Sequence, residues 1–256
     1  MIDIHVHILP FMDDGAADMG RSLVMAGIAH EDGISTLVAT PHVMTEAFDN
    51  NKEDILLKVD EVNAMLTKAD YPVVVLPGAE YYLEPDLPEQ LARGEVLTLN
   101  GSGRYLLVEL PSSCVPDYTG QILYEIQLQG FVPIIAHPER NAGFIRDPRL
   151  LKDFVDKGIL AQLTSASVTG LFGRTVRQAA LSFVEGGLVQ VLASDAHSVN
   201  DRAPVLSRAA AEIARYYGPD LALALVKSNP QRIINGLPLE AMPAVCKPRL
   251  WKRWFG

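Results

Sequence analysis

Residues 1–15 read MIDIHVHILPFMDDG, and in them a short apolar run leads directly into two histidines and two aspartates. The run Ile2–His5 alternates β-branched and polar residues and is predicted as a strand. Alternate residues of an extended strand point to the same side, so His5 and His7 can bind one metal ion together. A first strand that ends in metal-binding side chains predicts a fold in which strand ends form the site.

Six further short apolar runs are predicted as strands. They are Ser35–Thr40, Val73–Pro77, Tyr105–Leu110, Val132–Ala136, Leu160–Leu163 and Val189–Ala193. Stretches with helical spacing of apolar residues lie between most of them, and helices are predicted at Gly20–Glu31, Glu53–Thr67, Gly173–Glu185 and Ala203–Tyr217. This alternation predicts parallel strands joined by helical crossovers. Seven strands in 256 residues favour a closed or nearly closed α/β barrel, with a doubly wound open sheet as the alternative.

The composition fits one globular domain, because 48% of the 256 residues are hydrophobic and no low-complexity linker or sequence repeat interrupts them. We therefore expect a single domain over residues 1–256, with residues 238–256 as a C-terminal strap or tail. The tail ends in KPRLWKRWFG, whose basic and aromatic residues could instead dock on a membrane surface or an acidic partner.

The charge and the cysteine content narrow the functional classes. A net charge of −9 argues against binding to nucleic acid or to an anionic membrane. No apolar run approaches the roughly 18 to 20 residues that span a bilayer, so no stable membrane insertion is expected. The N-terminus lacks the features of a secretory signal and there are only two cysteines, which predicts a cytoplasmic protein without a disulfide framework. The sequence does not predict the oligomeric state.

Five of the six histidines lie at or just after predicted strands, and three acids take matching positions. The histidines are His5, His7, His42, His137 and His197, and the acids are Glu80, Glu109 and Asp195. His30, in the first predicted helix, lies outside this pattern. The carboxyl ends of parallel barrel strands meet on one face, so we expect these side chains to converge.

Imidazole and carboxylate together suit zinc, manganese or iron. Asp14, from the loop after the first strand, brings the candidate metal ligands to nine: His5, His7, Asp14, His42, Glu80, Glu109, His137, Asp195 and His197. One ion uses about four ligands, so nine indicate two or three ions that share ligands, and Glu80 could bridge two of them. Asp14 is favoured over its neighbour Asp13, although either could cap the loop.

The series MIDIHVH…DDG…TPH…GAE…VEL…AHPERN…SDAH resembles the polymerase and histidinol phosphatase (PHP) superfamily. Within it, the pattern is most similar to the bacterial manganese-dependent tyrosine-protein phosphatases of capsule and exopolysaccharide operons. The resemblance extends from residue 1 to about residue 240. It implies the PHP fold, a distorted (β/α)7 TIM-like barrel, and metal-dependent hydrolysis of phosphotyrosine.

The resemblance also implies a role for each candidate residue. His5, His7, Glu80 and Asp195 would hold a first ion, Asp14, His42 and His197 a second, and Glu80, Glu109 and His137 a third. Many members of the wider superfamily have a histidine at the position of Asp14, whereas the capsule phosphatases have an aspartate. Arg140 and Arg202 match positions that the family uses to hold phosphate and are the predicted catalytic residues, with surface salt bridges as the alternative.

The resulting hypothesis is that a water bridging two ions attacks phosphorus in line, while the third ion and Arg140 neutralise the phosphoryl oxygens. Manganese is the expected metal, although iron, zinc or cobalt would also accept these ligands. The implied partner is the phosphotyrosine-bearing C-terminal tail of a bacterial tyrosine kinase. Tyr81 or Tyr82 could pack against the phosphotyrosine ring.

Other functions remain open for the same pattern. A small-molecule phosphatase of the histidinol-phosphate type and a nuclease would use the same fold, although the acidic charge opposes the nuclease. An amidohydrolase typically has a lysine at a middle strand end, where this chain has Glu80, Glu109 and His137. A non-catalytic, metal-stabilised subunit is a further alternative. A cysteine-dependent phosphatase needs an arginine six residues after its cysteine, but Gly120 and Lys252 stand at those positions.

Overall fold

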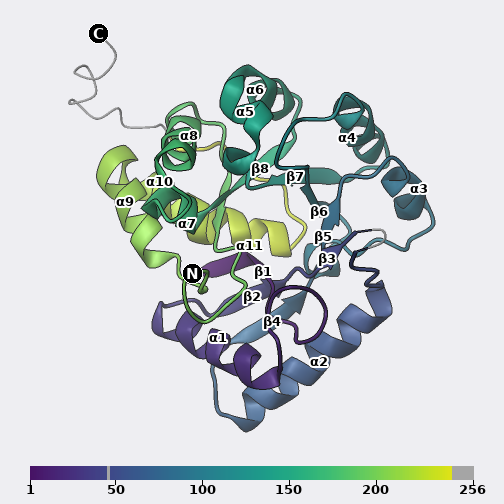
Figure 1. Cartoon of the computed structure of the whole chain (residues 1–256), viewed down its shortest axis with the longest axis vertical. Helices are drawn as coiled ribbons and strands as arrows, with labels where there is room; N and C mark the ends of the chain where they lie inside the picture. The colour runs from purple at the N-terminus through teal and green to yellow at the C-terminus, as the bar shows by residue number, and fades with distance from the viewer. Residues whose placement is uncertain (45–46, 244–256) are drawn as a thin grey trace.

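The computed structural model describes residues 1–44 and 47–243, in which short strands alternate with helices (Figure 1). The strands are β1 (Ile2–Val6), β2 (Thr36–Ala39), β3 (His42–Val43), β4 (Val74–Pro77), β5 (Glu80–Tyr82), β6 (Tyr105–Glu109), β7 (Val132–Ala136), β8 (Leu160–Thr164) and β9 (Val191–Ala193). All strand pairs are parallel. The predicted parallel α/β fold is therefore confirmed.

The helices surround the strands on the outside (Figure 1). The longer ones are α1 (Met19–Glu31), α2 (Lys52–Lys68), α4 (Thr119–Leu128), α6 (Pro148–Asp156), α8 (Arg174–Glu185) and α9 (Ser207–Tyr217). The shorter ones are α3 (Leu87–Ala92), α5 (Ala142–Arg146), α7 (Ser165–Thr169), α10 (Pro219–Leu223) and α11 (Asn229–Ile234), with 3₁₀ turns at Leu99–Gly101 and Pro138–Arg140 and a π-helical turn at Ala224–Ser228. The helix α11 differs from the others, because its buried Ile233 and Ile234 belong to the same small apolar cluster as Ile2 and Ile4 of β1.

Three of the four predicted helices are confirmed to within a residue at each end, but the fourth begins later than predicted. The prediction placed its start at Ala203, whereas α9 begins at Ser207. Pro204 disfavours the helical conformation of the residue before it. The Asp32 carboxylate then accepts the N–H groups of Leu206 and Ser207, at 2.7 and 2.9 Å, and so caps the helix from a distant segment.

Two short strands, β3 and β5, were not predicted. The strand β2 pairs with β4, and after a short break in each segment β3 pairs with β5. Pro41 lies in the first break, where its carbonyl accepts the N–H of Glu80 at 3.1 Å. Gly78 lies in the second break, where a Cβ atom would stand 2.8 Å from Val38 Cγ1. Strands of two and three residues are too short for an alternating pattern to reveal them.

The strands form two sheets, in the orders β1-β2-β4 and β3-β5-β6-β7-β8-β9. The first and last strands of the chain lie side by side. The N–H of His7 donates to the carbonyl of Ala196, and the N–H of Asp195 donates to the carbonyl of His5, both at 2.9 Å. These bonds bring the HVH motif next to the SDAH motif, which is nearly 200 residues away in the sequence.

Alternation along the strands separates the apolar core into two clusters. In β6, Leu106 and Val108 belong to the larger cluster, which also contains the buried faces of most helices. Tyr105 and Leu107 belong to a smaller cluster, to which α11 contributes Ile233 and Ile234. The side chain of Glu109 points to the same face of β6 as those of Tyr105 and Leu107. It therefore lies on the face of the smaller cluster, at the carboxyl end of the strand.

Residues 238–243 form no helix or strand and lie against α11. Arg232 Nε donates to the carbonyl of Pro238 at 2.6 Å, and Arg232 Nη1 donates to Glu240 at 2.7 Å. The rest of the predicted tail, residues 244–256, lies outside the described residues. Among the described helices, none is long and apolar enough to cross a membrane.

The cap provided by Asp32 predicts a stability effect. Asp32→Ala should lower the free energy of unfolding by about 1 kcal/mol, since α9 loses the acceptor of its first N–H groups. Chemical denaturation measures this change, and Glu31→Ala removes a neighbouring exposed charge as the matched control. Equal stability of the two variants would show that the cap contributes nothing.

Candidate metal centre

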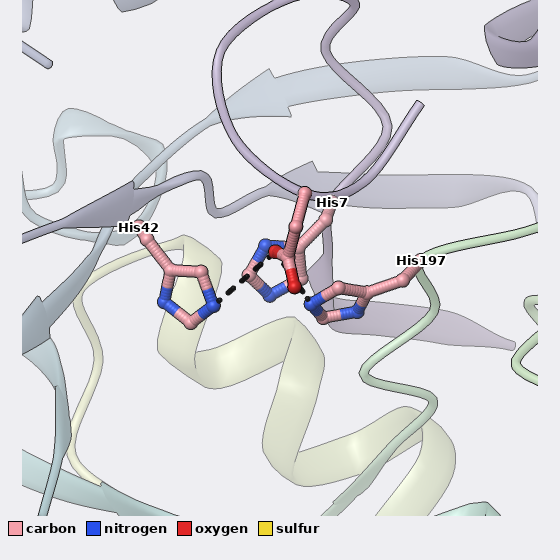
Figure 2. A group of neighbouring side chains, drawn as sticks. His7, His42 and His197 are labelled. Carbon is pink, nitrogen blue, oxygen red and sulfur yellow. Dashed lines mark ion pairs between the residues drawn. The ribbon is translucent and has the colours of Figure 1, made fainter. Parts of the chain in front are cut away.

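The nine predicted ligands meet at the carboxyl ends of the strands. Each histidine of the group has a ring nitrogen no more than 3.7 Å from a carboxylate oxygen of the group, and each acid has an oxygen that close to a histidine nitrogen. Figure 2 shows the rings of His7, His42 and His197 facing one another from three separate segments of the chain. The structure thus brings together every residue that the sequence suggested as a ligand.

Glu80 stands at the middle of this cluster. Its Oε2 atom lies 3.1 Å from both His5 Nε2 and His42 Nδ1 and 3.4 Å from His7 Nε2. Its Oε1 atom lies 3.0 Å from His137 Nε2. The side chain is fully buried, and within the described part of the chain Oε2 has no hydrogen-bond partner. Burial opposes the charge of Glu80, but the positive field of His5 holds its pKa well below the usual range.

The imidazoles of His5 and His7 lie near both Asp195 and Glu80. His5 Nε2 lies 3.1 Å from His7 Nε2 and 3.5 Å from Asp195 Oδ1, and His7 Nε2 lies 3.5 Å from the same oxygen. Glu80 Oε2 lies near the same two nitrogens, at the distances given above. Ligand atoms about 2.0 to 2.2 Å from a tetrahedral ion are roughly 3.3 to 3.6 Å apart, so the spacing within His5, His7 and Glu80 is close to that of one ion, and Asp195 lies beside these two histidines.

The outer nitrogens of three histidines have hydrogen-bond acceptors behind them. With Nδ1 as the donor, His5 bonds Gln162 Oε1 at 2.8 Å and His7 bonds Asp13 Oδ2 at 2.6 Å. The Nδ1 of His197 lies 3.1 Å from the carbonyl oxygen of Asp195. In this tautomer each Nε2 directs its lone pair at the cluster, as a metal ligand must.

The neighbours Asp13 and Asp14 have different positions. Asp14 Oδ1 lies 3.3 Å from His197 Nε2 and 3.7 Å from His42 Nε2, on the open side of the cluster. Asp13 lies behind His7 and also accepts the backbone N–H of His42 at 3.0 Å. Gly15 permits this turn, because a Cβ atom there would stand 2.2 Å from the carbonyl oxygen of His7. Asp13 therefore orients ligands, while Asp14 faces them.

Sequence reasoning missed the supporting roles of Asp13 and Gln162. The DDG motif drew attention to Asp13 only as a possible loop cap. Gln162 is the one polar side chain within the strand segment LAQL, and such a residue in a buried strand was the available signal.

The geometry gives three overlapping ligand groups whose atoms lie within 4.8 Å of one another. They are His7, Asp14, His42 and His197; His5, His7 and Glu80; and His42, Glu80 and Glu109. The sets implied by the resemblance differ in four respects. His7 joins the second group here and His42 joins the third, while Asp195 is absent from the first group and His137 from the third. His137 remains next to the third group, with its Nε2 atom 3.6 Å from Glu109 Oε1.

The charges of the third group favour a cation. Burial and the adjacent Glu80 carboxylate raise the pKa of Glu109 to about 7. Burial and the nearby Arg140 lower the pKa of His137 to about 4, so its imidazole stays neutral. Two carboxylates beside a neutral imidazole form a donor set that a divalent ion would stabilise.

Both predicted arginines bind the same carboxylate oxygen. Arg140 Nη1 pairs with Asp195 Oδ2, and Arg202 Nη2 lies 2.8 Å from that oxygen. Phe172, which the sequence did not suggest, stacks under the Arg140 guanidinium at 5.1 Å. Because Asp195 Oδ1 faces His5 and His7, this buried carboxylate joins the ligands to the arginine pair.

Two of the predicted ligands have strained backbones. His137 and Asp195 adopt the left-handed conformation, with φ of 32° and 52°. A non-glycine residue in this region costs on the order of 1 kcal/mol or more, and such strain concentrates at functional sites.

Comparison with known proteins agrees with this geometry. Residues 1–235 match the sequence family described as "Capsular polysaccharide synthesis, CpsB/CapC". The chain belongs to this family. This confirms the resemblance found in the sequence motifs.

Members of the CpsB/CapC family with assigned activities are similar to almost the whole chain. Tyrosine-protein phosphatase YwqE of Bacillus subtilis is 40% identical over 97% of this chain and 98% of its own length. Tyrosine-protein phosphatase CpsB of Streptococcus pneumoniae is 33% identical over 91% of this chain and 98% of its own. A crystal structure from work on these two "unique metal-dependent tyrosine phosphatases" matches with a TM-score of 0.91 and 38% identity, covering 97% of this chain and 100% of the matched chain.

The hydrogen bond behind His7 predicts the effect of one substitution. Asp13→Ala should weaken Mn²⁺ binding by about tenfold to a hundredfold, because His7 loses the acceptor that fixes its tautomer and orientation. Titration calorimetry on metal-stripped protein measures the affinity. Asp60→Ala, which removes an exposed carboxylate from α2, is the matched control. An Asp13→Ala protein that folds and binds Mn²⁺ like the control would contradict the assignment.

Proposed function

We propose that this chain is a metal-dependent phosphatase that hydrolyses phosphotyrosine in proteins of capsule or exopolysaccharide synthesis. One observation carries the proposal: a largely buried cluster of nine imidazole and carboxylate side chains adjoins two arginines, within a chain of the CpsB/CapC family. The activities of YwqE and CpsB support the same conclusion.

Two or three divalent ions would be held by the ligand sets. His5, His7, Glu80 and Asp195 would hold the first, Asp14, His42 and His197 the second, and Glu80, Glu109 and His137 the third. We infer that the metal is manganese, although these nitrogen and oxygen donors also accept iron, zinc or cobalt. When bound, such ions supply positive charge to the phosphoryl oxygens and lower the pKa of an attacking water.

The arginines would bind the substrate phosphate. The planar fork of a guanidinium binds phosphate bidentately, and Asp195 holds the forks of Arg140 and Arg202 together at the edge of the cluster. Stacking on Phe172 restricts the plane of Arg140. A tyrosine leaving group needs little protonation, because phenol has a pKa of about 10.

Only one of the two tyrosines suggested for ring contact is accessible. Tyr81 is 4% exposed, and its hydroxyl accepts the N–H of Leu97 at 2.7 Å, so the suggestion that it packs on substrate is wrong. Tyr82 is half-buried and pairs in register with Glu109, at the rim of the cluster. We propose Tyr82 as the contact for the phosphotyrosine ring.

The proposed partner is the phosphotyrosine-bearing tail of a bacterial tyrosine kinase. A flexible tail could reach a site that lies at the ends of the strands.

We also infer that the strands form a distorted (β/α)7 barrel. The segments β2 and β3 together occupy one strand position, and so do β4 and β5, which gives seven positions in all. The first and last positions, at β1 and β9, are joined by backbone hydrogen bonds at their carboxyl ends.

Metal removal tests the proposed activity. Metal-stripped protein should not hydrolyse a phosphotyrosine peptide, and Mn²⁺ should restore hydrolysis. His5→Ala/His7→Ala should lose more than about a hundredfold of the restored rate, since losing ligands exceeds the effect of losing their hydrogen-bond partners. His30→Ala, in the histidine outside the cluster, should retain the rate.

The same assay with histidinol phosphate and single-stranded DNA distinguishes the alternatives. The account predicts the highest kcat/KM on the phosphotyrosine peptide. Hydrolysis of histidinol phosphate alone, by folded protein with Mn²⁺, would contradict the tyrosine phosphatase and favour a small-molecule enzyme.

A further inference from the structure

Glu139 is a fully buried carboxylate in the 3₁₀ turn after β7, between the predicted ligand His137 and Arg140. Its Oε1 atom accepts the backbone N–H of Thr164 at 3.0 Å and the hydroxyl of Ser167 at 2.6 Å. Among the described residues, its Oε2 atom has no hydrogen-bond partner. A buried carboxylate is costly unless hydrogen bonds compensate, and neither of these donors belongs to the metal centre. The two bonds therefore have a purpose other than holding a metal ion.

The Ser167 donor lies in α7, the short helix that precedes Phe172. The N–H of Leu171 donates to the carbonyl of Ala166 at 2.9 Å, so the chain folds back onto α7 immediately before Phe172. The ring centre of Phe172 then lies 5.1 Å from the guanidinium carbon of Arg140. Stacking on an aromatic face limits the rotation of a guanidinium plane. The helix that bonds to the turn is thus the one that positions the ring under Arg140.

Arg140 is therefore fixed at both ends of its side chain. At the backbone, its N–H donates to the carbonyl of His137 at 3.0 Å, within the turn that Glu139 fastens to α7. At the far end, the guanidinium pairs with Asp195 and stacks on Phe172. A long side chain loses rotamer freedom when it binds a ligand, and restricting it beforehand lowers that cost.

We propose that Glu139 is a positioning residue for Arg140. It fastens the turn that carries Arg140 to the helix that leads to Phe172, and so holds the guanidinium in place for a phosphoryl group. This inference rests on the proposed binding of phosphate by Arg140. Only Oε1 is hydrogen-bonded, so the amide oxygen of a glutamine can keep both bonds, whereas an alanine loses them.

The effect of Glu139 should reach Arg140 and not the predicted ligand on the other side of the turn. His137 directly follows β7, and its Nε2 atom lies 3.0 Å from Glu80 Oε1. These contacts hold His137 independently of Glu139. Loss of the Glu139 carboxylate is therefore expected to weaken phosphate binding while the manganese content stays the same.

A double-mutant cycle on phosphate binding tests the coupling. The full chain is loaded with Mn²⁺, and its dissociation constant for inorganic phosphate is measured by titration calorimetry. Arg140→Ala should raise this constant about tenfold or more, and Glu139→Ala should raise it about fivefold. In the Arg140→Ala background, Glu139→Ala should add less than about twofold, because it acts through the arginine that is already missing.

Two milder variants separate positioning from a general loss of structure. Glu139→Gln should keep the phosphate affinity within about twofold of wild type, since both hydrogen bonds can form. Ser167→Ala removes one donor and should weaken binding about twofold to threefold, again only when Arg140 is present. Ser182→Ala removes an exposed serine hydroxyl from α8 and is the matched control. If Glu139→Ala does not fold, Ser167→Ala completes the cycle in its place.

The outcomes separate this inference from the proposed function. An equal loss of phosphate affinity in both backgrounds, or a loss of manganese from folded Glu139→Ala, would overturn the positioning role and leave the phosphatase standing. Unchanged phosphate affinity in Arg140→Ala would overturn the role of Arg140 and this inference with it. An intact cycle without hydrolysis of a phosphotyrosine peptide would overturn the tyrosine phosphatase and leave the positioning role standing.

Discussion

The buried carboxylate of Glu80 is the constraint on which the site depends. A carboxylate taken out of water costs several kcal/mol unless charges of opposite sign surround it. Here imidazole nitrogens from β1, β3 and the end of β7 approach both of its oxygens. Burial alone would lower the pKa of His5 and His42, but the surrounding carboxylates, Glu80 first among them, raise it, which favours positive charge around Glu80. Bound metal ions would supply this positive charge instead.

The fold places the partners of Glu80 by pairing the two ends of the chain. The backbone bonds of His7 with Ala196 and of Asp195 with His5 hold the first and last motifs in register. Asp3 strengthens this junction, since its buried carboxylate accepts the N–H of Ser194 at 3.0 Å. Backbone geometry thus holds the predicted ligands of the first and last strands, and the hydrogen bonds of Gln162 and Asp13 orient the rings of His5 and His7.

The sequence predicted the parts of this structure that depend on local patterns. Apolar runs located seven strand positions, and the residues at the ends of those runs or in the loops after them supplied all nine members of the cluster. Features that depend on contacts between distant segments were not predictable in this way. Asp32 sets the start of α9 from the end of α1, Gln162 supports His5 from β8, and Phe172 supports Arg140 from the loop before α8. Tyr81 and Tyr82 are equivalent in sequence, and only tertiary burial distinguishes them.

The metal content of Glu80→Gln tests the central claim most directly, because the account makes Glu80 a shared ligand. Wild-type protein dialysed against buffered Mn²⁺ should retain two or three ions per chain by elemental analysis. Glu80→Gln should lose more than one ion, while Glu109→Gln, which removes an unshared ligand, should lose one at most. A folded Glu80→Gln protein with the wild-type number of ions would contradict the account.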